Sequence, residues 1–175
     1  MTPDMQRAKR PVSRLIAGTY GHPYHPALVT VPIGAWSASL IFDVASRTVS
    51  RPAFLTAGSK WLIVIGIAGA IVASIAGFID LASLPEGTAV YRTACAHMAI
   101  NLALIFAYVV DFEWRERAPA RTAPVSAGML ALSAACIALL AVSGFLGGRL
   151  AYRYGVRVAD EATQAAGFRA GRHNA

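Results

Sequence analysis

Residues 61–84 read WLIVIGIAGAIVASIAGFIDLASL, and Asp80 is the only charged side chain in this stretch. The hydrocarbon core of a bilayer is about 30 Å thick, which takes roughly 20 apolar residues in a helix. A helix satisfies every backbone polar group within the segment, as lipid requires. This stretch therefore predicts a helix that crosses a membrane. The whole chain agrees, since it is 56% hydrophobic and only 14% charged.

Three other stretches are similarly long and apolar, at residues 26–45, 93–112 and 125–154. The connections between them are short and contain proline and glycine, which end helices. The sequence therefore predicts an all-α fold, an integral membrane up-and-down bundle of four transmembrane helices. Residues 1–20 are expected to form a basic cytoplasmic segment, residues 21–155 the four-span domain and residues 156–175 a flexible tail.

The distribution of Lys and Arg predicts the orientation, because these residues resist translocation when they flank a span. Ten lie on the side of the two termini and six on the other. The first group is Arg7, Lys9, Arg10, Arg14, Arg92, Arg149, Arg153, Arg157, Arg169 and Arg172, and the second is Arg47, Arg51, Lys60, Arg115, Arg117 and Arg121. We expect a cell-membrane protein with both termini cytoplasmic. The net charge of +7 is spread over the span ends, which favours anionic lipid over nucleic acid as the partner.

Small residues recur at four-residue spacing in the second span, at Gly69, Ala73 and Gly77. In lipid, helices associate through close backbone approach rather than through a hydrophobic driving force, and such ridges permit it. Pro32 lies early in the first span and is expected to kink it, because proline removes one helical hydrogen bond. These features predict a tightly packed bundle and imply no chemistry.

Ionisable residues inside spans are costly and usually face the bundle interior. With the predicted topology, five such residues from all four helices lie at one level, near the cytoplasmic side. Asn101 follows the third histidine of the chain by four residues, so the two share a helix face. The predicted polar cluster consists of His22, His25, Asp80, His97, Asn101 and Arg149.

Two ligand sites can be built from this cluster. In the first, His25 and His97 ligate the iron of haem b, because helices one and three of a square bundle lie on a diagonal of roughly 11–14 Å. In the second, a divalent transition metal is bound, since imidazole and carboxylate suit Zn, Cu, Ni or Fe. The metal ligands would be His22, His25, Asp80 and His97.

A third interpretation is purely structural. Asp80 would pair with Arg149 or with a protonated His97, and the cluster would only fix the helices together. No nucleophile with a neighbouring base occurs, so an enzyme acting alone is not expected. On the opposite side, Asp43 and Asp111 end their spans, where a carboxylate can simply be hydrated.

Four stretches resemble the family catalogued as domain of unknown function 2231. They are GHPYHPALVTVPIGAW at 21–36, GFID at 77–80, HMAIN at 97–101 and GFLGGRLAYRYGVRV at 144–158. The resemblance implies a four-helix integral membrane protein with no assigned activity. Relatives are sometimes joined to a Rieske-type iron-sulfur domain, which implies membrane electron transfer. The polar cluster itself supports the leading hypothesis, a redox-related or ligand-binding membrane subunit that holds haem or a metal ion at this cluster, with a membrane redox protein or a homo-oligomer as its partner. The alternative is a structural or assembly protein.

Overall fold

The computed structural model describes residues 3–118 and 123–168. The described chain is mainly helical, with one two-stranded antiparallel pairing near its start. Its elements are α1 (Pro3–Lys9), α2 (Arg14–Ala17), β1 (Gly18–Thr19), β2 (His22–Pro23), α3 (His25–Leu28), α4 (Thr30–Ser46), α5 (Ala53–Leu81), α6 (Ala89–Arg117), α7 (Ala127–Gly148), a π-helical turn η1 (Arg149–Arg153) and α8 (Glu161–Ala166). Arg121, Arg169 and Arg172, which enter the orientation count, lie outside the described residues.

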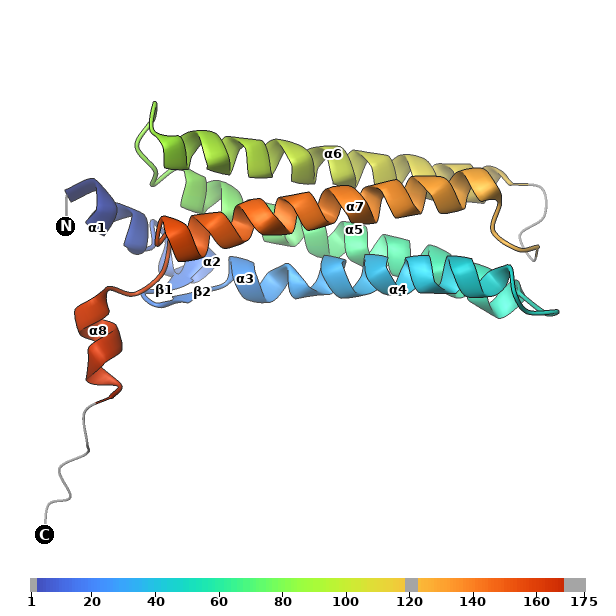
Figure 1. Cartoon of the computed structure of the whole chain (residues 1–175), viewed down its shortest axis with the longest axis horizontal. Helices are drawn as coiled ribbons and strands as arrows, with labels where there is room; N and C mark the ends of the chain where they lie inside the picture. The colour runs from blue at the N-terminus through green and yellow to red at the C-terminus, as the bar shows by residue number, and fades with distance from the viewer. Residues whose placement is uncertain (1–2, 119–122, 169–175) are drawn as a thin grey trace, which may run out of the picture.

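Four long helices run side by side as an up-and-down bundle, and α1 and α8 both lie at one end of it (Figure 1). α4 packs against α5 and α7, and α6 packs against the same two helices, so α4 and α6 lie on a diagonal. Within the described residues, four helices are long and apolar enough to cross a membrane: His25–Ser46, Ala53–Leu81, Ala89–Arg117 and Ala127–Arg153. The predicted all-α four-helix fold is confirmed.

The helix boundaries follow from local chemistry. Thr88 begins α6 by accepting a hydrogen bond from the Tyr91 amide, and Ser126 begins α7 in the same way with the Met129 amide. The first span is interrupted at Val29, between α3 and α4. Pro32 has no N–H for the carbonyl four residues earlier, so the hydrogen-bond ladder is weakened at this point.

The centre of the bundle is closed by two stacked aromatic rings. Trp36 of α4 and Tyr108 of α6 lie with ring centroids 4.1 Å apart across the diagonal. Both side chains are completely buried, together with Ile63 and Leu104. At Gly66 an added Cβ would lie 2.2 Å from the Trp36 indole nitrogen, so only glycine admits the ring. The small residues of α5 therefore receive the large side chains of the first span.

The first residues of the tail fold back onto the start of the chain. Gly155 has a positive φ of 69°, which turns the chain back toward the bundle, and Arg157 follows with φ 61°. The Arg157 side chain is buried and donates a hydrogen bond to the Ala17 carbonyl. The Tyr20 hydroxyl donates to Asp160. These contacts attach residues 156–160 to the first residues of the chain.

Candidate functional site

Two histidines face each other across the bundle diagonal, at the end where α1 and α8 lie. His25 is the first residue of α3, and His97 lies in α6 about two turns from its start. Their ring centroids are 6.1 Å apart, and the ring planes are nearly perpendicular at 82°. The diagonal placement that the sequence predicts for this pair is therefore present in the structure. We call this region the histidine end.

Each imidazole is tied to a backbone carbonyl of the next helix. The Nδ1 of His25 lies 2.8 Å from the Ala73 carbonyl oxygen of α5, and the Nδ1 of His97 lies 2.9 Å from the Ser143 carbonyl oxygen of α7. A carbonyl only accepts, so both Nδ1 atoms carry a proton, and in the neutral form of each ring the lone pair is on Nε2. Each neutral ring is thereby held in one tautomer, with Nε2 as the nitrogen that could ligate a metal.

A glycine lies one turn beyond each of these carbonyls and leaves room for the ring. An added Cβ at Gly77 would lie 3.1 Å from the His25 ring, and one at Gly147 would lie 3.2 Å from the His97 ring. Asn101 supports the second ring, as the sequence predicts. Its amide donates to the His97 carbonyl at 2.7 Å and lies 3.2 Å from His97 Nε2.

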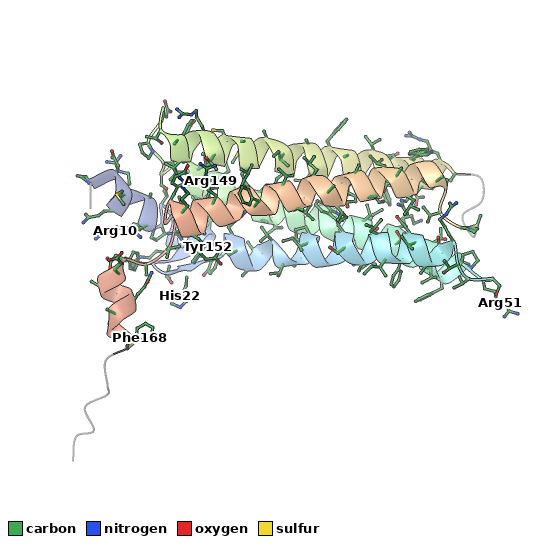
Figure 2. The ribbon with its side chains drawn as sticks, viewed as in Figure 1. Arg10, His22, Arg51, Arg149, Tyr152 and Phe168 are labelled. Atoms are coloured by element: carbon green, nitrogen blue, oxygen red, sulfur yellow. The ribbon has the colours of Figure 1, made fainter. Side chains whose placement is uncertain are left out.

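Asp80 is buried at the same end, but its partner is not the predicted one. Its Oδ1 lies 2.9 Å from Nε of Arg157 in the tail. Arg149 instead lies beside the helices at this end, with its guanidinium 5.5 Å from the Tyr154 ring centroid (Figure 2). The predicted pairing of Asp80 with Arg149 is therefore wrong. The turn at Gly155, which brings Arg157 back to the bundle, explains the difference.

His22 lies apart from the other histidines. Its side chain is exposed and projects away from the four helices (Figure 2). Within residues 3–118 and 123–168, no group of three or more His, Cys, Asp and Glu side chains could hold a metal ion. The predicted metal site of His22, His25, Asp80 and His97 is thus not assembled there, whereas the histidine pair is.

The model of a family described as a predicted membrane protein (DUF2231) matches residues 21–160, which is most of the chain. The chain belongs to the DUF2231 family. No curated protein and no solved structure matches it. Membership in DUF2231 and the four candidate spans together establish a membrane protein, and they leave its activity open.

A second polar cluster, which the sequence reasoning did not find, lies at the opposite end of this DUF2231 bundle. Asp43 and Asp111 are completely buried, so the expectation that they are hydrated is wrong. The Arg115 guanidinium lies between them, at 2.7 Å from Asp43 and 3.0 Å from Asp111. Hydroxyls of Ser59 and Ser133 complete the cluster. All four helices contribute, and we call this region the arginine end.

The residues that meet on the diagonal share one sequence spacing. His25 and His97, Trp36 and Tyr108, and Asp43 and Arg115 are each separated by 72 positions (97 − 25, 108 − 36 and 115 − 43), and each pair is in contact. Ala73 and Ser143, whose carbonyls accept from the two histidines, are separated by 70 positions, as are Gly77 and Gly147. The bundle therefore consists of two helical hairpins arranged alike about an axis along its length. This spacing, together with the four-residue spacing of Asp111 and Arg115, was the available sequence signal.

Proposed function

We propose that the protein is a redox-related or ligand-binding membrane subunit that holds haem through His25 and His97. The observation that carries the proposal is the distance of 6.1 Å between the two ring centroids. Two metal–nitrogen bonds of about 2.0 Å, with the ring centres a further ~1.1 Å beyond each nitrogen, need roughly 6.2 Å. The pair is therefore spaced for two imidazoles that share one metal ion.

The number of protein donors favours haem over a bare metal ion. A bare zinc site takes about four ligands. Haem iron brings four porphyrin nitrogens with it and needs only axial ligands, of which histidine is a common one. In the described residues the pair has no third His, Cys, Asp or Glu close enough to complete a metal site. Two histidines alone match the requirement of haem.

The surroundings of the pair also support this choice. A ligating histidine usually donates its other ring N–H to a carbonyl or carboxylate, and both histidines already donate to carbonyls. Two surface hollows of the described structure, one beside α1 and one along α6, are lined by neither histidine. Haem would therefore have to separate the helices at the faces of Gly77 and Gly147. Asn101 would give up its contact with His97 Nε2 and keep its bond to the His97 carbonyl.

The test begins with the protein purified in detergent from cells supplied with haem precursor. We expect a Soret band, with one haem per chain, and loss of that band in His25→Ala and in His97→Ala. His22→Ala is the matched control and should bind haem like the wild type, because its side chain is exposed and outside the pair. No Soret band and no stoichiometric metal by elemental analysis would contradict the proposal.

A structural role is the second candidate, and one observation favours it. Both ring nitrogens of His97 already have partners, at the Ser143 carbonyl and the Asn101 amide. If His97→Ala fails to fold and no ligand is ever bound, the histidine end serves only to hold α6 against α7. A His97→Asn variant that restores folding without haem would support the same conclusion.

We further propose that the protein lies in the cell membrane with both termini in the cytoplasm and acts with a membrane redox protein or as a homo-oligomer. The excess of Lys and Arg on the side of the termini supports the orientation. Reporter fusions test it, because a phosphatase fused at the C-terminus should be inactive and a fluorescent protein there should be bright. The opposite pattern would contradict it.

A further inference from the structure

The arginine end carries an uncompensated charge if all its groups are ionised. Two buried carboxylates, Asp43 and Asp111, share the single guanidinium of Arg115, which leaves a net charge of −1. An unpaired charge in a low-dielectric interior is very costly, and such a group usually becomes neutral instead. The charge count therefore calls for one more positive charge or one proton.

The charged neighbours on the packed helices are already engaged elsewhere. Arg47, the residue just after α4, donates to the Val125 carbonyl, and Lys60 of α5 pairs with Glu116 of α6. From α7 the cluster receives the Ser133 hydroxyl, and Cys136 is the nearest titratable group of that helix to it. Among the described residues, Asp43 and Asp111 therefore have only the Arg115 cation between them.

The hydrogen count leads to the same conclusion. Arg115 has five N–H groups, and three of them are used by Nε on Asp111 Oδ1 and by Nη1 on Asp43 Oδ1 and the Ser59 hydroxyl. Nη2 and the Ser133 hydroxyl retain three hydrogens between them. Among Nη2, Ser133 Oγ and the two Oδ2 atoms there are five contacts of 2.7–3.2 Å. Three hydrogens fill at most three of these five contacts, so an additional proton on one of the two Oδ2 atoms has room to fill a fourth.

Asp111 is the better acceptor of that proton. Asp43 receives both Nη atoms of Arg115, at 2.8 and 2.7 Å, together with the Ser59 hydroxyl, and these donors stabilise its ionised form. The contacts of Asp111 with Arg115 are longer, at 3.1 and 3.0 Å. The Tyr108 hydroxyl, one turn before Asp111, is buried without a hydrogen-bond partner among the described residues. Its electrostatic neighbours include both Asp111 and Asp43.

We propose that the arginine end is a binding site for one proton, which Asp111 holds at neutral pH. The proton comes from water at that end of the bundle and forms an O–H bond at Asp111 Oδ2. It is donated to Ser133 Oγ, whose own hydroxyl hydrogen then points to Asp43 Oδ2. The ionised Asp43 and Arg115 form a neutral pair, and the cluster has no net charge.

Infrared spectroscopy of the purified protein at neutral pH tests this site. The carbonyl stretch of a buried carboxylic acid should be present in the wild type and absent in Asp111→Asn. Asp80→Asn is the matched control and should keep the band. Asp80 is paired with Arg157 and, within the described part of the chain, does not share this cation with a second carboxylate. Ser133→Ala should keep the band but shift it upward, since the acid loses its hydrogen-bond acceptor. A wild type without the band, or a band that Asp111→Asn leaves unchanged, would overturn the proposal.

Folding gives a second, independent readout. An amide is neutral like a protonated acid, so Asp111→Asn should fold and unfold thermally close to the wild type. Asp43→Asn should lower the unfolding temperature much more, because it removes the ionised partner of Arg115. If Asp111→Asn fails to fold or is as destabilised as Asp43→Asn, Asp111 is ionised and the proposal is wrong.

Discussion

Each end of the bundle brings together corresponding positions of the two similar hairpins, but the two ends do so with different chemistry. At the arginine end, an acid of α4 meets an arginine of α6, and serines from the other two helices fill the remaining contacts. At the histidine end, α3 and α6 present two imidazoles, each of which contacts a backbone carbonyl. The arginine end is thus held together by charged groups, whereas the histidine end places two imidazole rings opposite each other on the diagonal. The difference shows that one architecture can supply an anchor and a candidate ligand site.

The largest effect is expected when the arginine end is broken. Arg115→Leu leaves Asp43 and Asp111 buried without their cation, which costs about 3–5 kcal/mol in comparable buried pairs. We expect a large loss of folded protein and a much lower unfolding temperature in detergent. Arg117→Leu, two residues away in the same helix, is the control. Its pair with Glu113 is exposed and worth at most about 1 kcal/mol. Equal effects of the two changes would contradict the anchoring role.

A smaller effect is expected from the ion pair at the histidine end. Arg157→Ala removes the cation beside Asp80 and the hydrogen bond to Ala17, which we expect to cost about 2–3 kcal/mol. Proteolysis should then cut residues 156–160 faster, because their attachment to the bundle is lost. Arg153→Ala is the control, since Arg153 is exposed. An unchanged cleavage rate in Arg157→Ala would show that this ion pair does not attach the tail.

Substitution by alanine should destabilise the protein more at Gly147, beside His97, than at Gly144 in the same helix. Gly147→Ala places a Cβ 3.2 Å from the His97 ring, and crowding of this kind costs about 1–3 kcal/mol, partly offset by the better helix propensity of alanine. We expect a net loss of about 1 kcal/mol and weaker haem binding. Gly144→Ala meets nothing within 4 Å and should be neutral or stabilising. Thermal unfolding and haem titration of the two variants compare them, and equal behaviour would contradict a role for the space at Gly147.

The smallest effect concerns acid pH at the histidine end. The Thr163 amide and side chain and the Tyr20 hydroxyl lower the pKa of Asp160. A lowered folded-state pKa stabilises the protein above the unfolded value of about 3.9, and this contribution is lost as the pH falls through the folded value. The wild type should thus be slightly more stable than Asp160→Ala at pH 6, and the two should converge in strong acid. A difference that persists in acid would exclude this carboxylate as its cause.

Some of these features could be predicted from the sequence. Apolar length predicted the four helices, and helix order placed His25 and His97 on one diagonal. The partner of Asp80 could not be predicted, because Arg157 reaches it through a turn that depends on the positive φ of Gly155. Asp43 and Asp111 lie near helix ends, where sequence alone does not distinguish a hydrated carboxylate from a buried one. Only packing of all four helices around Arg115 shows that both are buried.

The most direct test of the central claim is the spin state of bound haem in the purified protein. If His25 and His97 are equivalent axial ligands from two similar hairpins, electron paramagnetic resonance of the oxidised wild type should show low-spin, bis-histidine iron. His25→Ala and His97→Ala should each convert any remaining haem to the high-spin form to the same extent. A wild type that binds no haem, or haem whose spin state neither variant changes, would contradict the account.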